Sequence, residues 1–159
     1  MIEIPPQLLT AALAALPLTE LRAALPIAIG KFGMDAGSAF LYSVIGNLIP
    51  VPFILWLLPK AVKWTSRHWV WAHRVLDSYF LRLKAKHGER FERASMIVIA
   101  VFVAIPLPGT GAWTASVLAV LFAISPKYSI PGIVAGVLGA GTIVLLITTG
   151  ALGALSWIL

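Results

Sequence analysis

Residues 105–113 read IPLPGTGAW, and this stretch decides the fold. No continuous helix crosses it, because proline lacks the backbone N–H and glycine is a poor helix former. It separates two apolar runs, Ala94 to Ile105 and Ala112 to Ile124. At about 1.5 Å per residue, neither run crosses a hydrocarbon core of about 30 Å. The turn residues favour a helical hairpin over 94–124, whereas a rival interpretation joins 94–124 into one broken spanning helix.

The beginning of the chain repeats this pattern. An apolar run from Leu8 is stopped by Pro17, and Thr19 is placed to cap a second short helix, so a hairpin is expected over 7–33. Pro17 and Pro106 each begin a Pro-Leu pair, and the two pairs lie 89 residues apart. This spacing indicates an internal repeat.

A long uncharged block follows each hairpin, and we expect transmembrane helices over 36–59 and 130–159. A kink is predicted in the second half of the first block, which contains Gly46, Asn47, Pro50 and Pro52. Because one spanning helix separates the hairpins, they face opposite sides of the membrane. The sequence therefore predicts an all-α integral membrane protein built as an inverted repeat, in which a re-entrant helical hairpin precedes a transmembrane helix in each half.

The composition agrees with a membrane location. Of 159 residues, 60% are hydrophobic and 11% are charged, against about 45–50% and about 25% in soluble domains. The mean hydropathy is +0.95. These values exclude a soluble globular domain and a nucleic-acid-binding module. The absence of cysteine excludes disulfides and thiolate metal sites.

The positive charge is concentrated in one segment, residues 60–93. Nine of the 12 lysines and arginines lie there with three of the six acids, so this segment carries the whole net charge of +6. The positive-inside rule places 60–93 in the cytoplasm of a cell that inserts the chain in its cytoplasmic membrane, with both termini outside. Basic residues and tryptophans on different sides of the segment favour a helix at the headgroup interface.

Two hairpin tips that meet near the midplane would form a binding site. The second helix of each hairpin starts at its tip, and helix N-termini favour anions such as a phosphate headgroup. Thr110 would add a hydroxyl donor, and Gly109 and Gly111 let the backbone approach a ligand closely. Pro106 and Pro108 shape this tip.

Glu20 and Arg22 follow the first tip. Because a charged side chain in contact with lipid raises the free energy, both are expected to face the interior of the protein. In the functional interpretation, which we favour, Arg22 binds the anionic group and Glu20 carries a proton. In the structural interpretation, Glu20 caps a helix and Arg22 pairs with it or reaches the interface.

Three further candidates have balanced or structural explanations. Pro26, inside the second short helix, either frees a carbonyl for the site or kinks a packed helix. Trp113 is more simply a packing residue than a platform for substrate. Asn47 is a possible polar ligand, although an interhelical hydrogen bond explains it better. The small residues Gly132, Gly136 and Ala140 form a stripe for close packing against either the first span or a second protomer.

The sequence gives little support for enzyme activity. The three histidines lack the spacing of metal ligands, and no serine lies in a motif typical of a catalytic nucleophile. We therefore expect no enzyme activity and no cofactor, apart from proton coupling.

Two stretches carry a family resemblance. Residues 20–26, ELRAALP, and residues 105–114, IPLPGTGAWT, resemble paired signatures of the small multidrug export protein family. That family is in turn distantly similar to the DedA / SNARE-associated (VTT) superfamily. The resemblance implies inverted halves with re-entrant hairpins, and movement of lipids across the bilayer. In DedA relatives, acidic and arginine residues of the hairpins are tied to function, and here only Glu20 and Arg22 match that role.

The first functional prediction is therefore a translocase for a lipid or lipid phosphate, either polyprenyl phosphate or phospholipid, which works as a homodimer among membrane lipids. The alternative is a proton-coupled exporter of small amphipathic cations with Glu20 as exchange site. A third possibility is a membrane scaffold that transports nothing.

Overall fold

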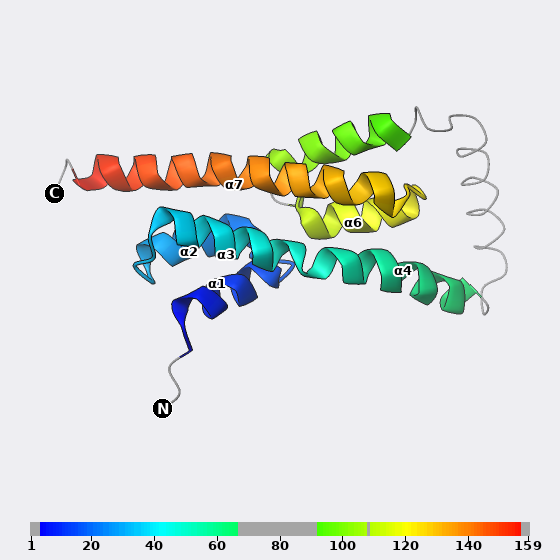
Figure 1. Ribbon diagram of the computed structural model, residues 1–159, viewed down its shortest axis with the longest axis horizontal. Coiled ribbons are helices and arrows are strands. Elements are labelled where there is room, and N and C mark those ends of the chain that lie inside the picture. Colours follow the sequence, from blue (N-terminus) through cyan, green and yellow to red (C-terminus); the bar gives the residue numbers. More distant parts are fainter. Residues whose placement is uncertain (1–3, 67–91, 108, 157–159) are drawn as a thin grey trace.

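The computed structural model describes residues 4–66, 92–107 and 109–156, and in these ranges the chain forms helices and no strand (Figure 1). The helices are α1 (Pro6–Ala15), α2 (Glu20–Gly30), α3 (Ala36–Leu48), α4 (Pro50–Ser66), a helix over residues 92–104, α6 (Ala112–Leu121) and α7 (Pro126–Ser156).

Two short helix pairs form the middle of the molecule. The chain turns after α1, and α2 runs back along it; α6 likewise runs back along the 92–104 helix (Figure 1). The first turn begins at Leu16, whose backbone is extended because the residue before a proline is pushed out of the helical region. Between the 92–104 helix and α6 the chain likewise reverses its direction, as expected for a helical hairpin (Figure 1).

Two long apolar helices, Ala36–Ala61 and Pro126–Ala151, are long and apolar enough to cross a membrane. The first of them is interrupted only at Ile49, between α3 and α4, in the part where the sequence predicts a kink. Pro50 has no N–H to continue the α3 hydrogen-bond ladder, but it fits the first turn of α4. α4 then continues beyond residue 59 to Ser66.

The last helix, α7, begins at Pro126, four residues before the predicted start at 130. Proline fits a first helical turn, where no N–H partner is needed. The carbonyl of Ser125 accepts hydrogen bonds from the amides of Tyr128 and Ser129 at 3.0 Å each. The Ser-Pro-Lys sequence therefore starts this helix.

Glycines on the long helices allow close packing against the short ones. A Cβ at Gly46 would lie 2.2 Å from the carbonyl oxygen of Ala11 in α1, and a Cβ at Gly136 would lie 2.8 Å from that of Ala100. Gly132 lies equally close to the 92–104 helix. The small-residue stripe therefore packs within this chain, against a helix that neither earlier interpretation named.

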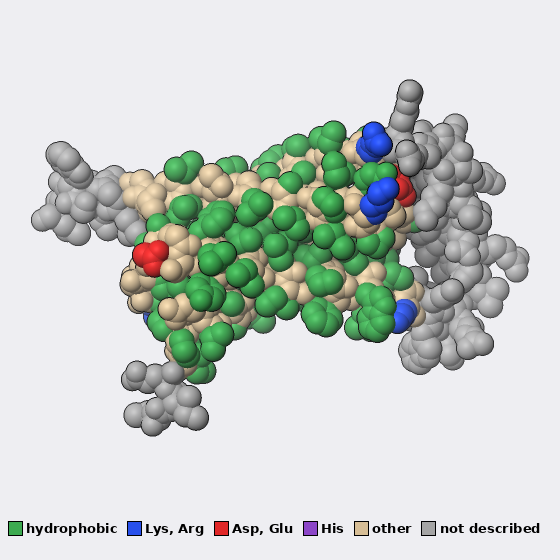
Figure 2. Space-filling model, in the orientation of Figure 1, with side chains coloured by type: hydrophobic (Ala, Val, Ile, Leu, Met, Phe, Trp, Pro, Cys, Tyr) green, Lys and Arg blue, Asp and Glu red, His purple; other side chains and the backbone are tan. Residues whose placement is uncertain are grey.

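The second helix of each pair packs on the long helix of the other half, α2 on α7 and α6 on α4. The buried core of Leu21, Leu25, Val103, Ile133 and Val137 joins the halves. The face shown in Figure 2 is covered with hydrophobic side chains, and the charged side chains visible on it lie near the two ends of the molecule. Exposed Phe53, Ile97 and Leu146 exemplify this exterior, which suits contact with lipid.

Candidate functional site

The turns of the two helix pairs meet near the middle of the molecule (Figure 1). A cavity of about 550 Å³ lies between them. Both tips contribute to its walls, which consist of Pro17, Leu18, Thr19, Glu20, Arg22, Ala23, Pro106, Gly109 and Thr114. The site thus draws on segments that lie almost 90 positions apart in the sequence.

Glu20 places its carboxylate on the N-terminus of α6. Its Oε1 lies 3.5 Å from the amide nitrogen of Trp113, which donates to it. A Cβ at Gly111, the residue that precedes α6, would lie 1.6 Å from Oε2. Gly111 has no side chain with which to cap α6, so the carboxylate from the other tip accepts a hydrogen bond from the first turn.

The backbone of Glu20 is strained. Its φ of +46° lies in the left-handed region, which costs a residue with a side chain about 1–3 kcal/mol. Only 7% of the residue is exposed. Strain of this kind persists where the surrounding contacts fix the backbone, and here the contacts with Gly111 and Trp113 do so.

Arg22 ties the same two tips together. Its Nη2 donates a hydrogen bond of 2.9 Å to Oγ1 of Thr110 and lies 4.0 Å from Oε2 of Glu20. The Thr110 hydroxyl lies 2.7 Å from the carbonyl oxygen of Ile105 and 2.9 Å from that of Leu107, so it also braces its own turn. Among the described residues, the buried Nε of Arg22 has no hydrogen-bond partner.

Trp113 makes a third link between the tips. Its indole Nε1 donates a hydrogen bond of 3.1 Å to the carbonyl oxygen of Ala15. Ala15 is the last residue of α1, where carbonyl groups lack partners within the helix. Trp113 therefore closes a helix end, in addition to any contact with a substrate.

The remaining candidates are spread more widely. Pro106 and Gly109 line the cavity, while Pro108 lies outside the described residues. Pro26 sits inside α2 and leaves the carbonyl of Arg22 without its helical N–H partner. Asn47 lies in α3, 1% exposed, and not in the cavity wall. Its buried Oδ1 has no hydrogen-bond partner among the described residues.

Two expectations about the helix starts need correction. Thr19 precedes α2, but its hydroxyl donates to the carbonyl of Leu13 and does not cap α2. The N-terminus of α6 was expected to be free for an anion, but the carboxylate of Glu20 already lies on it. A glycine that precedes a helix without a capping side chain was the available signal for this arrangement.

Sequence reasoning also missed five cavity residues, which are Pro17, Leu18, Thr19, Ala23 and Thr114. Ala23 and Thr114 each lie about one helical turn beyond their tip, Ala23 after Glu20 and Thr114 after Gly111. Helical spacing from the predicted tips would have found these two. Leu18, in the turn itself, gave no signal beyond its position.

In the residues that the structure describes, the protein is all-helical, and its two long apolar helices and apolar exterior fit a membrane protein. A family described as "Putative small multi-drug export protein" matches residues 20–143, and the chain belongs to this family. The match begins at Glu20, directly after the first turn, and includes the second tip, and it confirms the resemblance to the small multidrug export family. No curated protein and no solved structure shows significant similarity to the chain.

Proposed function

We propose that the chain exports small amphipathic cations in exchange for protons, with the cavity between the tips as its substrate site and Glu20 as the exchange group. The observation that carries this proposal is the position of the Glu20 carboxylate, inside the cavity and on the N-terminus of α6. Transport of this class agrees with the family to which the chain belongs.

The position of Glu20 favours a cation over an anion. An anionic substrate would need the helix N-terminus that Glu20 occupies, and it would meet the negative charge of the carboxylate. A cation instead gains a partner in the cavity. The volume of about 550 Å³ lies within the range of small-molecule pockets, and Pro17, Leu18 and Pro106 supply apolar wall.

Glu20 can couple binding to movement because its carboxylate joins the two tips. When ionised, it accepts the amide hydrogen bond from Trp113 and attracts Arg22. A proton or a bound cation neutralises the carboxylate and weakens both contacts. The tips are then free to separate, which would open the cavity to the other side of the membrane.

The packing supports the inverted repeat as part of this proposal. Ala11 and Ala100 are 89 residues apart, and the glycines that pack on them, Gly46 and Gly136, are 90 residues apart. The two helix pairs also run in opposite directions along the molecule (Figure 1). In the proposed arrangement both pairs are re-entrant, and the homodimer remains a prediction.

The test measures uptake of a cationic dye by proteoliposomes under an imposed proton gradient. We expect Glu20→Gln to abolish gradient-driven uptake, because the amide keeps the shape of the carboxyl group but carries no exchangeable charge. Asp35→Asn is the matched control and should keep full activity, because Asp35 is exposed and lies away from the cavity. Equal uptake by Glu20→Gln and the unchanged protein would refute the role of Glu20.

A second candidate, translocation of a lipid phosphate, is favoured by one observation. The buried Nε of Arg22 has no partner among the described residues and is a donor suited to a phosphate oxygen. Labelled phospholipid and polyprenyl phosphate should therefore be offered in the same proteoliposomes. Movement of either lipid, lost in Arg22→Gln and without dye uptake, would replace the cation proposal. Transport of none of them would favour the scaffold.

A further inference from the structure

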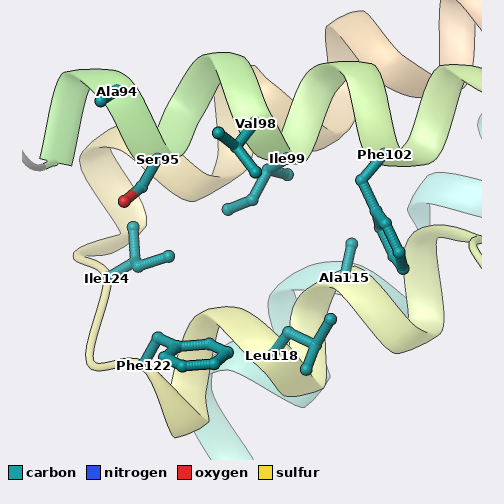
Figure 3. A pocket seen from close by; sticks show the side chains of 9 residues that line it. All are labelled: Ala94, Ser95, Val98, Ile99, Phe102, Ala115, Leu118, Phe122 and Ile124. Carbon is teal, nitrogen blue, oxygen red and sulfur yellow. The ribbon is translucent and has the colours of Figure 1, made fainter.

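A second cavity lies between the two helices of the second pair. It has a volume of about 320 Å³ and is lined from one side by the 92–104 helix and from the other by α6 and the turn after it (Figure 3). It shares no lining residue with the cavity between the tips. It is therefore a separate site.

The walls of this cavity are hydrocarbon. In Figure 3 the side chains of Val98, Ile99 and Phe102 face Leu118 and Phe122 across an open space. Ser95 carries the single hydroxyl among the lining side chains. Protein interiors rarely contain empty apolar space of this size, and such walls offer a ligand no polar contact of consequence. The occupant is therefore apolar where it lies in the cavity.

The 92–104 helix gives the cavity a route from the lipid phase. Ile97, Val98 and Val101 on this helix are 61%, 66% and 55% exposed, and Val98 also lines the cavity. An apolar surface that continues from the outside of the helix into the cavity suits a flexible hydrocarbon chain, which can enter sideways from the membrane.

Positive charge marks one end of the cavity. The lining residues Ala94 and Ile124 lie at this end, next to exposed Arg93 and close to exposed Lys127. The acid nearest in sequence, Glu92, accepts a hydrogen bond of 3.0 Å from the hydroxyl of Ser125. Arg93 and Lys127 together with the Glu92 carboxylate leave a net positive charge beside the apolar cavity, which complements an anionic headgroup above a hydrocarbon chain.

We propose that this cavity holds one acyl chain of an anionic phospholipid, whose phosphate lies at Arg93 and Lys127. The lipid is a bound constituent of the protein and not its transported substrate. Because its chain lies between the 92–104 helix and α6, the lipid sets the separation of the two helices that carry the second tip. This inference goes beyond the proposed function and holds whether the substrate is a cation or a lipid phosphate.

The experiment is native mass spectrometry of the full chain in detergent, titrated with dioleoyl phosphatidylglycerol or dioleoyl phosphatidylcholine. We expect the unchanged protein to prefer phosphatidylglycerol by on the order of tenfold. The double variant Arg93→Gln/Lys127→Gln should lose this preference, whereas Lys31→Gln, which removes an exposed charge elsewhere, should keep it.

A second pair of variants tests the place of the chain. Val98→Trp puts an indole at the open side of the cavity and should reduce binding of both lipids. Val101→Trp is the control, because Val101 is exposed on the same helix but does not line the cavity. Both sites are exposed, so folding should tolerate either change.

Three results would overturn the proposal. The first is equal affinity of the unchanged protein for the two lipids, and the second is equal loss of lipid binding in the two tryptophan variants. The third is displacement of bound phosphatidylglycerol by the cationic dye, one molecule for one, which would make the cavity part of the transport site. Because the readout is binding, it is independent of the transport assay.

Discussion

At the residue scale, the interaction of Glu20 with Gly111 joins the two tips. One residue supplies a carboxylate and the other supplies the space for it, since any side chain at Gly111 would occupy the position of the carboxyl group. The positive φ of Glu20 indicates that the backbone is held in place to keep this contact. The site therefore depends as much on a missing side chain as on a charged one.

Gly111→Ala should displace Glu20 and reduce dye export at least tenfold, because the new Cβ would lie 1.6 Å from the carboxylate oxygen. The measurement is gradient-driven uptake into proteoliposomes at matched protein content. Gly30→Ala is the control, since a Cβ at Gly30 has no atom within 4 Å. Export by Gly111→Ala at the level of Gly30→Ala would contradict the proposed role of the contact.

Trp113→Phe should lower the free energy of unfolding by about 1 kcal/mol, because it removes the hydrogen bond to Ala15 and keeps most of the aromatic surface. Thermal unfolding in detergent measures this change. Trp56→Phe, on an exposed ring of α4, should have a smaller effect. A larger loss in Trp56→Phe would show that the Trp113 hydrogen bond contributes little.

The sequence alone could identify Glu20, Arg22 and the second tip, because ionisable residues and Pro-Gly turns stand out in an apolar chain. It could not assign their partners. Arg22 bonds to a residue 88 positions away and Glu20 to one 93 positions away, so only the packing of the helices brings them together. Capping is local at the start of α3, where the Asp35 carboxylate accepts a hydrogen bond of 2.9 Å from the backbone N–H of Ser38.

At the element scale, the glycines of the long helices determine how close the short helices lie. Gly136→Ala should destabilise the protein by about 1–3 kcal/mol, because its Cβ would lie 2.5 Å from Cβ of Val103. Gly150→Ala, in the same helix but in open space, should stabilise it by about 0.5–1 kcal/mol. Opposite shifts in thermal unfolding check this pair, and a shift of the same sign for both would contradict the packing.

The start of α3 should respond to acid. Hydrogen bonds from the backbone and hydroxyl of Ser38 hold the pKa of Asp35 below its usual range. A lowered pKa means that the cap is complete above the ordinary aspartate pKa and is lost as the pH falls through the folded value. The amide resonance of Ser38 should therefore shift at low pH, and this shift should vanish in Asp35→Asn, whose amide caps the helix without titrating.

Proline shows why element boundaries were harder to predict than the elements. Pro17 and Pro106 lie where short helices end, whereas Pro50 and Pro126 are first residues of helices. Both outcomes follow from the missing N–H, which harms a helix interior but not a first turn. Whether a helix ends or begins at a proline depends on whether the backbone carbonyls that precede the proline accept hydrogen bonds from other donors.

At the scale of the whole molecule, the charges predict its orientation. In the proposed topology, the end with Lys60 and Lys127 is cytoplasmic and the turn between α2 and α3 is outside. The chain has no cysteine, so single cysteines can be introduced without a background. In intact cells, an impermeant maleimide should label a cysteine at Lys31 and not one at Lys127. Labelling at position 127 and not at position 31 would show the opposite orientation. Equal labelling at both positions would contradict the proposed topology.

The contacts between the two halves have a consequence for the synthesis of the protein. The nascent chain exposes Glu20 and Arg22 to the translocon long before Thr110 and Trp113, their partners in the other tip, have been translated. α2 also packs on α7, which is translated after it. A polypeptide truncated after residue 66 lacks these partners, so we expect it to be degraded faster than the full chain.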